Sequence, residues 1–166
     1  MDLAHIAERT DLPLRTLRYV LEQGLLPVAQ LTGRGRGVPR DLVASEAVPV
    51  AVAAAMLEAG LKGATVARIL LRLSRAQWIS VPKPNPLGVG RTNALVDVSI
   101  RSGQTILELG DGLAARLTHK PPPPFKYKVT TGWLELARGA QLDDAFDPVG
   151  RVVMNVGRLR DRLQAG

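Results

Sequence analysis

Hydrophobic positions in the first half of the chain recur at the three- and four-residue spacing of amphipathic helices. Asp2 and Ser45 are residue types that cap helix starts, and Pro13 fits a first turn because its missing N–H has no intrahelical partner there. Gly24 and Gly60 are expected to end the helices that precede them. The pattern therefore predicts four helices, over residues 2–8, 13–24, 45–59 and 64–73.

The second predicted helix separates its side chains into two faces. Leu14, Leu17 and Leu21 share one face at spacings of three and four residues. A second set follows the spacing i, i+3, i+4 and i+7 and consists of Arg15, Arg18, Tyr19 and Glu22. We expect the leucines to be buried and the helix to present two guanidinium groups and a phenol to solvent.

The second half of the chain has a different pattern. Residues 81–90 contain three prolines and two glycines and cannot continue a helix. Beyond them, alternating or apolar runs predict strands at 94–100, 104–109, 125–130 and 133–137. Asp147 and Pro148 are expected to begin a terminal helix, with one face formed by Val152, Val156, Leu159 and Leu163.

These patterns together predict an α+β protein in three parts. Residues 1–75 form a helical domain, residues 76–92 a Pro/Gly-rich linker, and residues 93–166 a small β-rich module with a C-terminal helix.

Composition excludes several classes of protein. The chain has 166 residues, 46% of them hydrophobic, and no cysteine, which rules out disulfides, thiolate metal sites and cysteine nucleophiles. The longest strongly apolar run, residues 47–57, is too short to span a bilayer, and the start of the chain lacks the pattern of a secretion signal. We therefore expect a cytoplasmic protein with no membrane partner.

The net charge of +7 indicates an anionic partner, and the positive charge is local. No acidic residue falls within residues 12–21 or 23–40, which hold Arg15, Arg18, Arg34, Arg36 and Arg40. An exposed helix with long donors can enter the major groove of DNA and reach phosphates and guanine edges. Glycines around arginines let a loop approach the sugar-phosphate backbone or a minor groove closely. These residues favour double-stranded DNA as the partner.

The segment RTLRYVLEQGLLP, residues 15–27, together with the Gly/Arg segment and the helix that ends MLEAGL, resembles the winged helix-turn-helix domain of the MerR family of bacterial transcription regulators. The resemblance covers residues 1–75. It implies that Arg15 and Thr16 approach the groove and that Arg18 and Tyr19 hold backbone phosphates. It also implies that residues 33–40 form a wing that acts through Arg34, Arg36 and Arg40.

The chain departs from the MerR pattern in several places. Val20 replaces the family's second tyrosine, and Val43 replaces the hydroxyl residue that often caps the third helix. Pro82, Pro84 and Pro86 forbid the long dimerisation helix that usually follows the fourth helix. The resemblance therefore implies a MerR-like DNA reader joined to a different module.

The third predicted helix is apolar where the family commonly carries charge. The positions concerned are Val48, Ala51, Ala54 and Leu57. Such a face needs a cover, and the hypothesis is that the C-terminal module or a second subunit packs on it.

Other candidate sites are weaker. The segment LGVGRTN lacks the Lys and Ser/Thr of a phosphate loop, and His5 and His119 have no second ligand at metal spacing. Asp143, Asp144 and Asp147 are more typical of helix caps than of a cation site, and no acid–base or nucleophile pattern indicates an enzyme. No cofactor or metal is expected. One face of the terminal helix carries Arg151, Arg158 and Arg162, which fit either a second DNA contact or a solvated surface.

The sequence thus predicts a sequence-specific DNA-binding transcription regulator and not an enzyme. A homodimer is expected, because one small winged helix makes too few base contacts to select a site in a genome. Residues 93–166 are expected to serve dimerisation, effector binding, or contact with RNA polymerase or another protein. Two alternatives stay open: an excisionase-like architectural protein that bends DNA, and an adaptor whose C-terminal module binds a protein.

Overall fold

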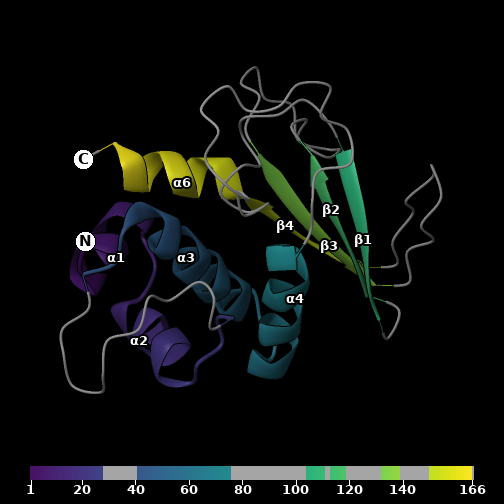
Figure 1. Ribbon diagram of the computed structural model, residues 1–166, viewed down its shortest axis with the longest axis horizontal. Coiled ribbons are helices and arrows are strands. Elements are labelled where there is room, and N and C mark those ends of the chain that lie inside the picture. The colour runs from purple at the N-terminus through teal and green to yellow at the C-terminus, as the bar shows by residue number, and fades with distance from the viewer. Residues whose placement is uncertain (28–40, 76–103, 111–112, 119–131, 139–149, 166) are drawn as a thin grey trace. The chain divides into compact units, whose positions relative to one another are not determined.

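The computed structural model describes residues 1–27, 41–75, 104–110, 113–118, 132–138 and 150–165 (Figure 1). Helices and an antiparallel sheet give an α+β structure, as predicted, in two compact units. The first unit comprises Met1–Ser74 together with the chain from Leu159 onward, and the second runs from Arg75 to Arg158. The end of the chain thus groups with the N-terminal half, a placement that the sequence pattern does not indicate.

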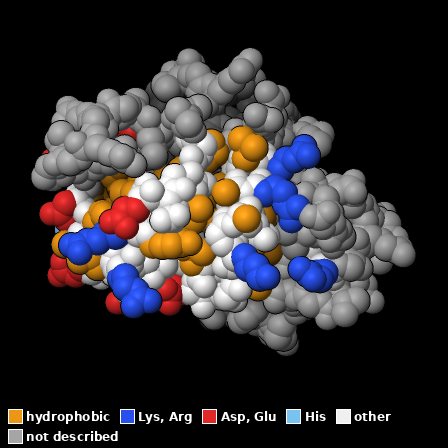
Figure 2. All heavy atoms as spheres, turned by 90° about the horizontal axis from the view of Figure 1, so that it is seen from below, with side chains coloured by type: hydrophobic (Ala, Val, Ile, Leu, Met, Phe, Trp, Pro, Cys, Tyr) orange, Lys and Arg blue, Asp and Glu red, His pale blue; other side chains and the backbone are white. Residues whose placement is uncertain are grey.

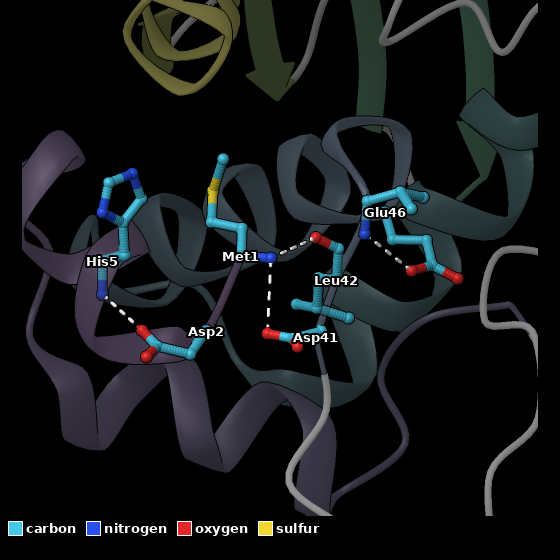
Figure 3. Close-up of polar contacts among 7 residues, drawn as sticks. Met1, Asp2, His5, Asp41, Leu42 and Glu46 are labelled. Atoms are coloured by element: carbon cyan, nitrogen blue, oxygen red, sulfur yellow. Dashed lines mark hydrogen bonds and ion pairs between the residues drawn. The ribbon is translucent and has the colours of Figure 1, made fainter. Parts of the chain in front are cut away.

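The first unit begins with two short helices, α1 (Leu3–Thr10) and α2 (Leu14–Glu22). Asp2 caps α1 as predicted, because its carboxylate accepts a hydrogen bond of 2.8 Å from the N–H of His5 (Figure 3). Asp11 follows α1 in the left-handed conformation with φ of 58°, where aspartate is tolerated better than most residues. Gly24 follows α2 with φ of +60°, a value that favours glycine.

The third helix, α3 (Ala44–Glu58), has a different cap from the one expected. Ser45 lies inside the helix, so its prediction as the N-cap is wrong. Val43 occupies that position, and its backbone N–H donates to the carboxylate of Glu46 at 3.1 Å (Figure 3). A glutamate three residues after the cap satisfies the free N–H at the helix start, so the helix can begin without a capping hydroxyl.

Helix α3 is buried from Glu46 to Ala54 and contacts both α1 and α2 (Figure 1). Of the four residues of the apolar face, Val48, Ala51 and Ala54 are fully buried and Leu57 is half-buried, so most of this face is covered. The hypothesis that the C-terminal module or a second subunit covers it stays a prediction. Helix α4 (Gly63–Arg75) follows after a short turn, and its predicted apolar face is buried at Val66, Ile69, Leu70 and Leu73.

Backbone hydrogen bonds fix the chain where it returns before α3. The N–H of Leu42 donates to the carbonyl of Met1 at 2.8 Å, and the nitrogen of Met1 donates to the carbonyl of Leu42 at 3.0 Å (Figure 3). Residues 41–42 are therefore held beside the start of α1.

The second unit is a four-stranded antiparallel sheet with strands in chain order. The strands are β1 (Gln104–Gly110), β2 (Leu113–Thr118), β3 (Trp133–Arg138) and β4 (Gly150–Asn155). Strands β1 and β3 confirm the predictions at 104–109 and 133–137. The strands predicted at 94–100 and 125–130, and the linker predicted at 76–92, lie outside the described residues.

Two parts of the sheet differ from the prediction. Residues 150–155 form β4 instead of the first turns of the terminal helix, which is α6 (Val156–Gln164). Val152 and Met154 alternate onto the face of Leu136 and Leu134, and this pairing overrides the helical spacing of Val152 to Val156. Strand β2 was not expected, because alanines such as Ala114 have a low strand propensity. It forms because it pairs with a strand on each side.

Asn155 links the sheet to α6. Its side-chain oxygen accepts a hydrogen bond of 2.8 Å from the N–H of Arg158, which caps the first turn of the helix. Asn155 therefore has the capping role that the sequence assigned to Asp147, a residue outside the described ranges. The helix begins in the second unit and ends in the first.

Candidate nucleic-acid interface

Helix α2 has an apolar and a polar face, as predicted, but its buried residues differ in part from the prediction. Of the three leucines expected to be buried, Leu17 is fully buried, whereas Leu14 and Leu21 are half-buried. Val20 is also fully buried, and together with Leu17 it fixes the rotation of the helix about its axis. Arg15 and Arg18 are exposed on the opposite side, and Tyr19 is 45% exposed. Within the described part of the chain, neither arginine has an ion-pair partner. Both guanidinium groups are thus available to an anionic ligand.

The exposed face of α2 continues onto the start of α4. A Cβ atom added to Gly63 would lie 3.5 Å from the hydroxyl oxygen of Tyr19 and 3.7 Å from a methyl group of Leu25. The phenol therefore lies against the first residue of α4. Lys62, the preceding residue, is exposed. The structure thus brings a lysine from the turn between α3 and α4 near Tyr19.

Lys62 is a candidate that the sequence analysis missed, although the sequence contains a signal for it. No acidic residue occurs between Glu58 and Asp97. Lys62 therefore opens a second acid-free basic segment, comparable to the one around Arg15 and Arg34. Periodicity alone does not show that the turn before α4 lies beside α2.

Thr16 has a different environment from its two arginine neighbours. It is half-buried, and its hydroxyl donates to Oε1 of Glu58 at 2.5 Å. Glu58 is the last residue of α3, so this hydrogen bond ties α2 to the end of α3. The carboxylate also adds a negative charge close to the exposed arginines.

The other predicted site residues lie outside the described ranges. Residues 28–40 contain all three arginines assigned to the wing, Arg34, Arg36 and Arg40. Val20 is fully buried and therefore does not contribute to the exposed face.

The surface seen from below in Figure 2 carries Lys and Arg side chains at several places. Among the described side chains in this view, those of Asp and Glu lie beside Lys and Arg at one end of the coloured surface.

Among the residues that the structure describes, no three His, Asp or Glu side chains gather into a metal site. The helices in the same residue ranges are too short or too polar to cross a bilayer.

Comparison of the chain with family models, with curated proteins and with solved structures finds no match. The function of the chain therefore has to be argued from its own residues.

Proposed function

We propose that the chain is a sequence-specific double-stranded DNA-binding transcription regulator, with a winged helix-turn-helix formed by α1, α2 and the segment that follows. The main support is the orientation of α2. Burial of Leu17 and Val20 leaves Arg15, Arg18 and Tyr19 on the opposite, solvent-facing side. A helix with this arrangement fits the major groove, where guanidinium groups reach phosphates and guanine edges.

The position of each residue in the fold indicates which part of the DNA it contacts. Arg15 lies in the first turn of α2, the part of a recognition helix that reaches base edges. Arg18, Tyr19 and Lys62 hold DNA phosphates beside the groove. Lys62 is included because Tyr19 lies against Gly63, the residue that follows it. Arg34, Arg36 and Arg40 contact the sugar-phosphate backbone or the minor groove from the wing. The protein acts as a dimer, with the second unit available for dimerisation or for a protein partner.

Arg18→Ala is expected to weaken DNA binding about tenfold and to reduce the slope of log affinity against log salt by about one, because one phosphate contact is lost. The measurement is a binding titration at several salt concentrations, on duplexes selected from a random pool. Arg138→Ala is the matched control, because it removes the same charge from an exposed position on β3. Absence of any enriched motif, with Arg18→Ala and Arg138→Ala indistinguishable, would contradict the proposed function.

Glu58→Gln is expected to strengthen DNA binding about two- to fivefold, because it removes a negative charge that repels phosphates and leaves an acceptor for the Thr16 hydroxyl. The same titration measures this change. Glu8→Gln provides the control, since Glu8 is an exposed carboxylate on α1. Weaker binding by the Glu58 variant would show that this carboxylate contributes a favourable contact, such as acceptance from a cytosine amino group.

A further inference from the structure

The last turn of α6 meets the last turn of α1. Arg162 donates from Nη1 to Oδ2 of Asp11 at 2.9 Å and to the carbonyl of Arg9 at 3.5 Å. Arg9 in turn donates from Nη1 to the carbonyl of Arg162 at 3.5 Å. Leu163, the next residue of α6, is almost fully buried. These contacts lie within the first unit, and Figure 1 shows α6 beside α1.

Electrostatics explains why Arg9 and Arg162 each donate to the backbone carbonyl of the other. The last carbonyls of a helix lack intrahelical partners and carry the negative end of the helix dipole. Two such ends placed together would repel each other, and the carboxylate of Asp11 adds a further negative charge. The guanidinium groups of Arg9 and Arg162 counter this repulsion, and each satisfies a carbonyl of the other helix. These contacts, together with the burial of Leu163, hold the end of α6 against α1.

Asp11 is also the point at which the chain turns from α1 toward α2. It adopts the left-handed conformation, with φ of 58°. Only Leu12 and Pro13 separate it from the first residue of α2. A side chain that holds Asp11 therefore helps to set the position from which α2 begins, four residues before Arg15.

We infer that Arg162 is a positioning residue for the DNA-binding surface, holding the turn between α1 and α2 from the far end of the chain. This inference rests on the proposed function. It gives Arg162 a role different from the two that the sequence left open, which were a second DNA contact and a solvated surface. The guanidinium group of Arg162 is engaged with α1, whereas Arg158, one turn earlier on α6, is exposed.

The test compares full-length Arg162→Ala with Arg158→Ala, because both remove one positive charge from α6. DNA affinity is measured well below the unfolding temperature, together with amide hydrogen exchange of residues 11–17 in the free protein. We expect Arg162→Ala to weaken binding roughly three- to tenfold with an unchanged salt slope, and to speed exchange in the turn. Arg158→Ala should change neither quantity. Arg162→Lys should restore part of the affinity.

A double-mutant cycle identifies the partner. Asp11→Asn keeps a residue that tolerates the left-handed conformation but removes the charge. If Arg162 acts through Asp11, the double variant will bind DNA about as weakly as the worse single variant, so that the effects are not additive. Additive losses would overturn the pairing.

Other outcomes separate this inference from the proposed function. A salt slope reduced by about one in Arg162→Ala would make Arg162 a direct phosphate contact and overturn the positioning role. Unchanged affinity and unchanged exchange would also overturn it. If the parent protein binds no DNA, the proposed function fails and the inference about the DNA surface fails with it. In that case, if amide exchange is faster in Arg162→Ala, the contact between Arg162 and Asp11 stabilises the turn but has no role in DNA binding.

Discussion

Ala54→Asp is expected to lower the free energy of unfolding by about 3–5 kcal/mol, because it places an uncompensated carboxylate in the centre of α3. Ala54 has no exposed surface, and the same holds for Val50 and Ala51, one turn earlier on the helix. Residues 47–57 of α3 contain no charged side chain that could pair with the new group. The measurement is urea denaturation followed by far-UV circular dichroism.

The pH dependence of this variant distinguishes charge burial from a simple change of volume. Burial disfavours the ionised form, so the pKa of the introduced carboxyl is raised in the folded state above its unfolded value of about 3.9. The folded state then binds more protons, and stability relative to the parent falls as the pH rises above about 4. Ala4→Asp is the control, because Ala4 is exposed in the first turn of α1, where an acidic residue is neutral or favourable. Equal stability of the Ala54 and Ala4 variants would show that this side of α3 is open to solvent.

The helical half was predictable because its signals are local. The spacing of Leu14, Leu17 and Leu21 against Arg15 and Arg18 correctly placed the arginines on the exposed side of α2, although the buried face is formed by Leu17 and Val20. The cap of α3 was harder to predict, because either Ser45 alone or Glu46 with the backbone of Val43 can satisfy the first turn. Only the folded geometry selects the second arrangement.

The sheet was less predictable because strand formation depends on partners distant in sequence. Val152 and Val156 share a helical spacing, yet the chain changes from strand to helix between them, at Asn155. The pairing of β4 with β3 determines where the strand ends, and the local sequence of β4 does not reveal that pairing.

The candidate site also has features that follow from the local sequence and features that depend on long-range packing. Exposure of Arg15, Arg18 and Tyr19 follows from periodicity. The proximity of Tyr19 to the start of α4, which makes Lys62 a candidate, depends on how α2 and α4 pack. The contact of Arg162 with Asp11 joins residues 151 positions apart, and no local pattern could indicate it.

Glu135→Ala is expected to destabilise the second unit by about 3–5 kcal/mol, because it removes a fully buried carboxylate that accepts two hydrogen bonds from the largely buried guanidinium group of Arg116. The two residues lie opposite each other on β3 and β2. Glu135 is fully buried, and its Oε2 accepts from Nε of Arg116 at 3.0 Å and from Nη2 at 2.5 Å. Far-UV circular dichroism in urea measures the loss, and Glu108→Ala on β1 tests whether any carboxylate of the sheet has the same effect.

The double variant Arg116→Met/Glu135→Leu separates the value of the ion pair from the cost of breaking it. Removing one partner leaves a desolvated charge, whereas replacing both with apolar side chains of similar size leaves none. We therefore expect the double variant to be much more stable than either Glu135→Ala or Arg116→Ala. If it is instead as unstable as the sum of the two single variants, the charged groups themselves hold β2 against β3. Shape and burial would then be insufficient to form the sheet.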